Sequence, residues 1–151
     1  MNDSQKAQSD GGKWLRVALW SAQILLAVVF GMFGLMKITT PIAQLAKNMP
    51  WVADYAMLIR FIGLSEVAGA LGLLLPALTR IAPVLTPIAA SGLVIVMVLA
   101  FAFHTVRGEF SGLPFVTALG AIAAFVAWGR FGRAAIAPRG TTPATLRSVT
   151  H

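Results

Sequence analysis

Four long apolar runs constrain the possible fold of this chain more than any other feature of its sequence. They cover about residues 14–36, 53–75, 84–104 and 113–131. An α-helix rises about 1.5 Å per residue, so a run of roughly 20 apolar residues crosses a hydrocarbon core of about 30 Å. Backbone groups in lipid must be hydrogen-bonded within the protein, which favours helices. We predict an all-α membrane protein with four transmembrane helices in a bundle, forming one domain over residues 14–131.

The composition agrees with a chain that lies in lipid. Hydrophobic residues make up 58% of it and charged residues only 11%, whereas soluble domains have about a quarter of their residues charged. The first apolar run is too long for a cleaved signal peptide, and Lys37-Ile-Thr-Thr-Pro41 behind it is a poor cleavage site. We therefore expect this run to be an uncleaved span.

The positive charges predict the orientation in the membrane. The net charge is +7, from 12 Lys and Arg against 5 Asp and Glu. Most cations lie near the ends of the apolar runs, which is typical of topology determinants and of contacts with anionic lipid head groups, and does not favour nucleic-acid binding. The positive-inside rule then places both termini in the cytoplasm of a bacterial plasma (inner) membrane. The side that holds the termini carries Lys6, Lys13, Arg16, Arg80, Arg130, Arg133, Arg139 and Arg147, and the other side Lys37, Lys47, Arg60 and Arg107.

The segments outside the spans are of two kinds. Residues 1–13 form a polar tail that we expect to be disordered, and residues 132–151 a basic, flexible one, both cytoplasmic. Between the first two spans, Thr40 followed by Pro41 is a helix-start signal, and apolar residues then recur at helical spacing as far as Pro50. This predicts a short amphipathic helix at the membrane interface.

Glu66 is the most informative single residue, because it is a carboxylate inside the second apolar run. Such a group costs on the order of 2.5–3.5 kcal/mol on insertion scales, so it should face protein or water. Small residues share its helical face, among them Gly63, Gly69 and Ala70, which suits a close helix–helix contact. Two interpretations stay open: a proton-exchanging or ligand-contacting acid, or a structural acid bonded to a hydroxyl such as that of Ser91 or to a basic partner.

Other polar residues predict a ring at the outer mouth of the bundle. Lys37 ends the first span and His104 the third, and both helices run outward in the expected topology. Lys37 could instead extend its ammonium to the head groups. Arg60 lies six residues before Glu66, about 120° off the same helical face, so we do not expect these two to pair.

Several kinds of chemistry are excluded or disfavoured. The chain has no cysteine, so disulfides, thiolate metal ligands and iron–sulfur ligation are excluded. His104 has one possible histidine companion, His151, near the C-terminus, and we predict no metal or haem site. The serines lack a histidine and an acid arranged to activate them, so we predict no catalytic residue and favour a protein without catalytic activity of its own.

The glycines of the first two spans carry a resemblance to a known family. Phe33-Gly34-x-x-Lys37 closes the first run, and Gly63-x-x-Glu66-x-x-Gly69-x-x-Gly72-Leu73-x-x-Pro76 fills the second. Such glycines predict close helix packing. A third run of small and apolar residues carries Ala100 and His104. Over about residues 15–131 this order resembles the DoxX-like family of small four-helix membrane proteins.

The resemblance implies a functional direction. The name-giving member is a subunit of a thiosulfate:quinone oxidoreductase, related bacterial proteins are linked to membrane redox or oxidative-stress complexes, and eukaryotic relatives to receptor assembly. On matching positions, Lys37, Glu66 and His104 would be the polar signature. Because this chain has no cysteine, a thiol-based version of the redox role is in doubt.

These observations lead to one preferred function and two alternatives. We expect an accessory subunit of a membrane-associated, quinone-linked redox complex that contacts the lipid bilayer, a partner membrane or redox protein, or a second copy of itself. The alternatives are a membrane chaperone or assembly factor without chemistry, and a small proton-linked transporter that uses Glu66. The candidates for ligand binding or proton exchange are Glu66, Lys37, His104 and Arg60.

Overall fold

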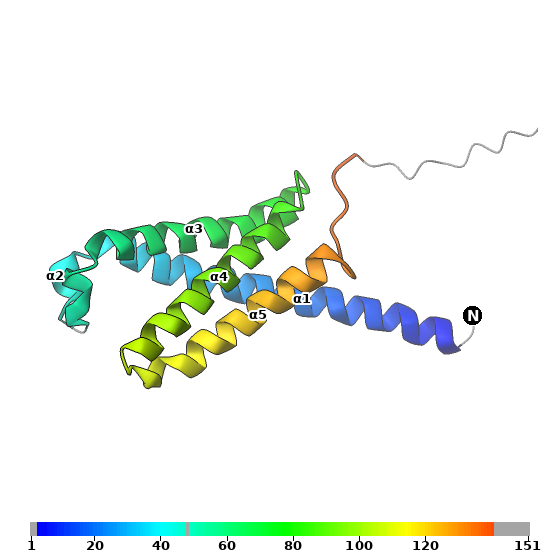
Figure 1. The fold of residues 1–151 in the computed structure, drawn as a ribbon. Helices are drawn as coiled ribbons and strands as arrows, with labels where there is room; N and C mark the ends of the chain where they lie inside the picture. The colour runs from blue at the N-terminus through cyan, green and yellow to red at the C-terminus, as the bar shows by residue number, and fades with distance from the viewer. Residues whose placement is uncertain (1–2, 48, 141–151) are drawn as a thin grey trace, which may run out of the picture.

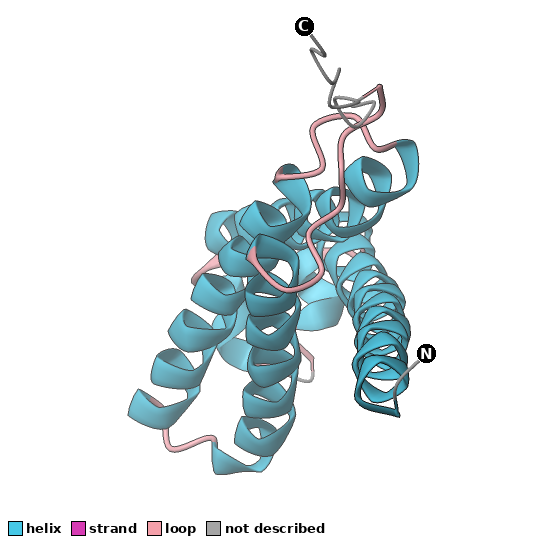
Figure 2. Cartoon of the chain, turned by 90° about the vertical axis from the view of Figure 1, so that its right-hand side faces the viewer, coloured by secondary structure: helices cyan, strands magenta, loops and turns pink. Residues whose placement is uncertain are grey.

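The computed structural model describes residues 3–47 and 49–140 (Figure 1). In this part of the chain the regular elements are all helices, joined by loops (Figure 2). Met1, Asn2, Asn48 and residues 141–151, which include Arg147 and His151, lie outside the described residues. The elements are α1 (Asp3–Thr39), α2 (Ile42–Leu45), η1 (Pro50–Ala53), α3 (Ala56–Thr79), α4 (Leu85–Val106), η2 (Phe110–Gly112) and α5 (Leu113–Phe131), the η elements being 3-10 helices.

Four helical stretches are long and apolar enough to cross a membrane. They are Gly11–Thr39, Ala56–Thr79, Leu85–Val106 and Phe110–Phe131. Their outward faces expose large apolar side chains, such as that of Met57, which is 85% exposed. A water-soluble domain would bury many of these side chains, whereas lipid is a good solvent for them. The predicted fold class, an all-α protein with four membrane-spanning helices, is confirmed.

The four long helices form two pairs that diverge toward one end. Figure 1 shows α3 following α1 and α5 following α4, with α4 crossing close to α3 near the end that carries both chain termini. We name this the termini end. The opposite end, which holds η1 and η2, is named the distal end. There the α1–α3 pair and the α4–α5 pair lie farther apart (Figure 1).

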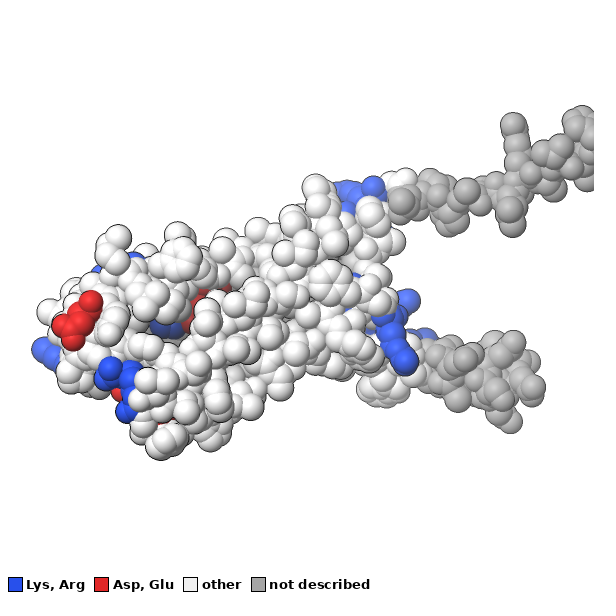
Figure 3. Space-filling model, in the orientation of Figure 1, with Lys and Arg blue, Asp and Glu red and all other residues white. Residues whose placement is uncertain are grey.

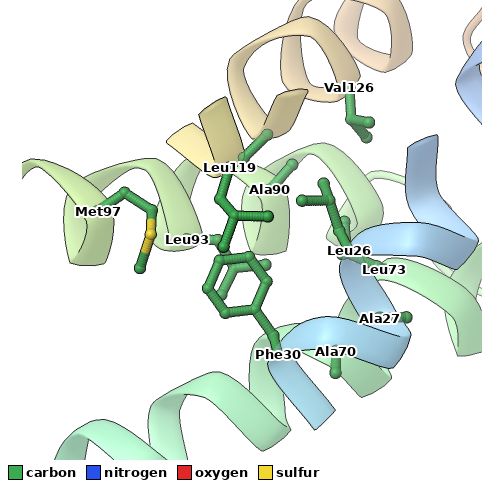
Figure 4. Close-up of a cluster of buried hydrophobic side chains, with 11 residues drawn as sticks. Leu26, Ala27, Phe30, Ala70, Leu73, Ala90, Leu93, Met97, Leu119 and Val126 are labelled. Atoms are coloured by element: carbon green, nitrogen blue, oxygen red, sulfur yellow. The ribbon is translucent and has the colours of Figure 1, made fainter. Parts of the chain in front are cut away.

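The core lies where the two pairs cross. Leu26 and Phe30 of α1, Leu73 of α3, Leu93 of α4 and Leu119 of α5 belong to one buried cluster. Figure 4 shows the ring of Phe30 extending from α1 toward the side chains of the neighbouring helices. Because lipid tails are as apolar as leucine, this cluster stabilises the bundle mainly through van der Waals contacts.

Two predicted packing glycines hold α3 against α4 near the termini end. A Cβ atom at Gly69 would lie 2.6 Å from Cδ2 of Leu93, and one at Gly72 would lie 2.7 Å from Cβ of Ala89. Real Cβ atoms do not approach neighbours this closely, so α3 and α4 can touch here only because both positions are glycine.

Both ends of the helical domain differ from the expectation. α1 begins at Asp3, within the segment expected to be a disordered tail of residues 1–13. Once the apolar run is helical, upstream helix formers such as Gln5 and Lys6 extend it without a new nucleation cost. After α5, the backbone N–H of Arg139 donates to the carbonyl of Arg80 at 3.0 Å. The described part of the segment expected to be flexible is therefore attached to the α3–α4 loop.

The second span also extends beyond its expected end. Pro76 lies inside α3, which continues for three more residues to Thr79 and ends at Arg80 in the left-handed conformation (φ 59°). Proline removes one backbone donor but can be accommodated in a membrane helix when neighbouring groups compensate. The expectation that the second span ends at residue 75 is therefore wrong by about one turn.

The interfacial helix is shorter than its apolar spacing indicates. α2 has four residues, Ile42–Leu45, and its N-cap is Pro41, without a side-chain capping bond and not Thr40 as expected. A second short segment, η1, follows at Pro50–Ala53. Leu45, Val52 and Ile59 form a small cluster that fixes this connection on α3.

Candidate functional site

Lys37 and Glu66 form an ion pair inside the helix bundle. The ammonium of Lys37, at the end of α1, donates to both carboxylate oxygens of Glu66 on α3, with Nζ 2.6 Å from Oε1 and 2.7 Å from Oε2. The side chain of Glu66 is 3% exposed and that of Lys37 24% exposed. In Figure 3 an acidic and a basic group lie together within an otherwise uncharged middle part of the surface. The attraction between the two charges offsets the hydration free energy that each loses on burial.

Two glycines bring the helices of this pair together. Gly34 lies one turn before Lys37, and Gly63 one turn before Glu66. A Cβ atom at Gly63 would lie 2.8 Å from Cβ of Lys37 and 2.9 Å from the carbonyl oxygen of Gly34. At Gly34 a Cβ atom would lie 2.7 Å from the carbonyl oxygen of Gly63. The backbones therefore approach closely enough for the short carboxylate arm of Glu66 to reach the ammonium.

Arg60 has a different position from the other predicted site residues. Its guanidinium donates to the backbone carbonyls of Lys37, Ile38 and Thr40. These carbonyls belong to the C-terminal end of α1 and the residue that follows it, where helical partners are lacking and the helix dipole favours a cation. Arg60 thus fixes the end of α1 and does not pair with Glu66, as expected from their spacing.

A cavity of about 520 Å³ lies beside the ion pair. We name it the central pocket. It occupies the space that opens where the two helix pairs diverge toward the distal end, and its size is within the range of small-molecule sites. Its walls are mostly apolar or aromatic: Phe30, Phe33 and Lys37 come from α1, Ile62, Ser65 and Glu66 from α3, Met97, Phe103 and His104 from α4, and Phe115 and Leu119 from α5.

Aromatic rings close the central pocket at the distal end. Trp51 of η1 packs on Phe103 of α4 with ring centroids 4.9 Å apart, and the ring of His104 lies edge-on to Trp51 at 6.5 Å. The guanidinium of Arg107 lies 5.1 Å from the centroid of Trp51 and 5.5 Å from that of Phe103. We name Trp51, Phe103, His104 and Arg107 the distal clasp, because they join η1 to the end of α4.

Glu109 binds two members of the distal clasp. One carboxylate oxygen accepts from Nε of Arg107 at 2.9 Å, and the other lies 2.8 Å from Nδ1 of His104. The hydrogen bond from Arg107, and after it the one from His104, lowers the pKa of Glu109 below its ordinary value of 4.5. Glu109 therefore stays ionised at neutral pH and holds His104 at the distal end of the pocket.

A second buried polar network joins three helices near the termini end. The amide nitrogen of Gln23 on α1 donates to the carbonyl of Leu73 on α3 at 2.7 Å, and its oxygen accepts from Nε of Arg130 on α5 at 2.6 Å. Nη1 of Arg130 also donates to the carbonyl of Ala134 at 3.1 Å. From the sequence, Arg130 is expected only as a topology charge, and Gln23 is not among the predicted site residues. The signal was present, since Gln23 is an amide in the middle of an apolar run, as Glu66 is a carboxylate in one.

The candidate residues fall into two groups by position. Lys37, Glu66 and His104 line the central pocket together, whereas Arg60 is not among its lining residues. The hydroxyl of Ser91, considered as a partner of Glu66, donates to the carbonyl of Pro87 in its own helix at 2.9 Å. The basic partner considered as the alternative is Lys37. The sequence predicts both residues as candidates, but it does not predict that they pair.

Comparison with known proteins gives one match. The model of the DoxX-like family matches residues 21–126, which is more than half of the chain and includes the ion pair, the central pocket and the distal clasp. No curated protein and no solved structure matches the chain.

Proposed function

The chain belongs to the DoxX-like family, and on this basis we propose that it is an accessory subunit of a membrane-associated redox complex that binds a lipid-soluble quinone in the central pocket. The observation that carries this proposal is the placement of a buried ion pair, Lys37 with Glu66, on the wall of an otherwise apolar and aromatic cavity. A cavity of this kind suits a molecule that is flat and apolar but has a polar edge.

The residues of the central pocket fit a quinone ring. Its carbonyl oxygens are acceptors, and the ammonium of Lys37, which has a third N–H beyond the two that it donates to Glu66, is a donor on the pocket wall. The rings of Phe33 and Phe115, with centroids 6.0 Å apart, offer an aromatic surface for stacking. A bound quinone would accept and deliver electrons for a partner, while this chain would bind and orient it.

Access to the central pocket from the bilayer supports a lipid-soluble ligand. Leu58, Phe61 and Leu99 line the pocket and are 42%, 67% and 63% exposed on the outer faces of α3 and α4. The distal clasp meanwhile covers the end of the pocket. A ligand dissolved in the lipid would therefore enter sideways between α3 and α4, in the region where these helices diverge.

The rest of the proposal concerns the setting of the protein. We place it in a bacterial plasma membrane with both termini cytoplasmic, because in the sequence the side expected to hold the termini has eight cations and the other side four. The distal clasp then lies at the outer face. The redox partner is a membrane or membrane-bound protein, and the chain itself performs no bond-breaking step.

The test is to identify what copurifies with the protein in a mild detergent. We expect extraction of the purified protein with organic solvent to release quinone in an amount comparable to the protein. Glu66→Gln should reduce this amount, because Lys37 then loses the carboxylate that holds its ammonium on the pocket wall. Val98→Phe, on the lipid-facing side of α4, is a matched control that should retain the quinone, since Val98 is 61% exposed and does not line the pocket. A protein free of quinone and of any redox partner would refute the proposal.

The ion pair also favours a second candidate, a small proton-linked transporter. A carboxylate within a membrane span that can exchange its proton is the usual element of such a protein. Proteoliposomes would then dissipate a pH gradient, and Glu66→Gln would abolish the dissipation. A membrane chaperone, by contrast, would change the abundance of a client protein and show neither quinone nor proton flux.

A further inference from the structure

A second cavity lies on the lipid-facing side of α3 and α4. It has a volume of about 450 Å³, and we name it the lateral groove. Small residues line it, including Ala68 of α3 and Gly92 of α4, both of which are exposed. A Cβ atom at Gly92 would have no heavy atom within 4 Å. The groove is therefore open at Gly92, while the close contact of Gly69 with Leu93 lies in its wall.

The lateral groove borders the central pocket. Ser65 and Val96 line both cavities, so the groove starts where the pocket opens between α3 and α4. From Val96 it extends along α4 as far as Ala89, about 10 Å toward the termini end. A ligand that occupied both cavities would have its polar end at Lys37 and Glu66 and its apolar end in the bilayer.

The route of any long ligand follows from this arrangement. At the distal end the clasp of Trp51, Phe103 and Arg107 covers the central pocket. Toward the termini end the buried side chains of Phe30 and Leu119, which belong to the core, line it. A chain attached to a head group in the pocket is thus directed sideways, past Ser65, into the groove.

We propose that the lateral groove binds the apolar chain of the ligand whose head occupies the central pocket, so that the site selects a head group carrying an unbranched or prenyl chain over the head group alone. This inference rests on the proposed function for the head group. Because the chain leaves one apolar solvent for another, selection comes from dispersion contacts with the groove and from its shape, not from the hydrophobic effect.

The experiment compares two quinones with the same benzoquinone head, one with a decyl chain and one without a chain. Binding to the full-length protein in nanodiscs is measured by quenching of tryptophan fluorescence, since Trp51 lines the central pocket. Gly92→Phe fills the groove, and the open space at Gly92 allows the fold to accept it. We expect this variant to weaken binding of the decyl quinone about tenfold and to leave the chainless quinone unchanged. Comparing variant with native protein for each quinone removes the effect of partition into lipid.

Val98→Phe is the matched control, because it adds the same ring on the same helix at a residue that lines neither cavity. It should change neither affinity. If Gly92→Phe leaves decyl-quinone binding unchanged, or weakens both quinones equally, the chain does not lie in the groove, while the proposed function still stands. If neither quinone binds the native protein, both proposals are refuted.

Discussion

At the scale of single residues, the arrangement around Glu66 shows how a costly group is retained in a membrane. The carboxylate is almost fully buried and accepts two hydrogen bonds from the ammonium of Lys37. Each charge compensates the other for the loss of hydration, and the unpaired group would be far more expensive than the pair. Arg60 stabilises the end of α1 that bears Lys37, because its guanidinium donates to backbone carbonyls there.

The first prediction concerns this ion pair. Lys37→Ala should lower the free energy of unfolding by about 3 kcal/mol, because it leaves Glu66 buried without a partner. The double variant Lys37→Met with Glu66→Met should recover most of that loss, since two apolar side chains need no partner. Thermal unfolding in detergent measures both. A double variant as unstable as Lys37→Ala would mean that the pair stabilises the fold beyond mutual neutralisation.

A second prediction at this scale concerns Glu109. Its pKa is lowered in the folded protein, mainly by the hydrogen bond from Arg107 and then by that from His104. The resulting stabilisation is fully present above the unfolded value near 4.5 and is lost as the pH falls through the lower, folded pKa. The native protein should therefore lose stability in this acidic range relative to Glu109→Gln. Parallel melting profiles of the two proteins below pH 4.5 would contradict the assignment.

At the scale of elements, glycines decide which helices touch. Gly34 and Gly63 let α1 lie against α3, and Gly69 and Gly72 let α3 lie against α4 nearer the termini end. The α3–α4 contact at Gly69 and Gly72 lies near the termini end. Helix α4 is therefore close to α3 at that end and diverges from it toward the distal end (Figure 1). The central pocket is the space left by this divergence.

The third prediction is that Gly63→Ala separates α1 from α3. The added Cβ would lie 2.9 Å from a backbone oxygen of Gly34, which cannot move without the helix. We expect a loss of about 1–3 kcal/mol in stability and release of bound quinone, because the ion pair is stretched. Gly31→Ala, also on the α1–α3 contact, is the matched control, since its Cβ would lie at an ordinary 3.8 Å from Cβ of Ala70 and Gly31 lines neither cavity. Equal melting temperatures for Gly63→Ala and the native protein would show that this contact is looser than described.

At the scale of the whole molecule, polar contacts hold the bundle at both ends of the core. The distal clasp joins η1 to α4, and the network of Gln23 with Arg130 joins α1, α3 and α5 near the termini. The described segment after α5 adds a backbone bond to Arg80 in the α3–α4 loop. The apolar core lies between these two layers.

The fourth prediction tests the network near the termini. Gln23→Leu should destabilise the protein by about 1–3 kcal/mol, because Nε of Arg130, a residue only 5% exposed, and the carbonyl of Leu73 lose their partner. The central pocket is lined by other residues, so quinone affinity in the folded protein should be unchanged. Unfolding in detergent and quinone binding in nanodiscs separate the two effects. A loss of affinity without a loss of stability would link this network to the pocket.

Much of this protein follows from its sequence alone. Four apolar runs are sufficient for four helices, because a backbone in lipid has almost no alternative way to bond its own polar groups. Glu66 can be identified as a candidate from the sequence, because the free energy of placing a carboxylate in the membrane depends on its position within the apolar run.

The tertiary structure decided which groups meet. Lys37 pairs with Glu66, Arg60 binds carbonyls of α1, and Gln23 binds Arg130, each across helices that are distant in sequence. An ammonium of Lys37 extended to the head groups was also consistent with its position at a helix end. Helical periodicity defines the face on which a residue lies but not the helix that covers that face. Here that choice depends on where glycines allow close approach, and hence on the packing of all four helices at once.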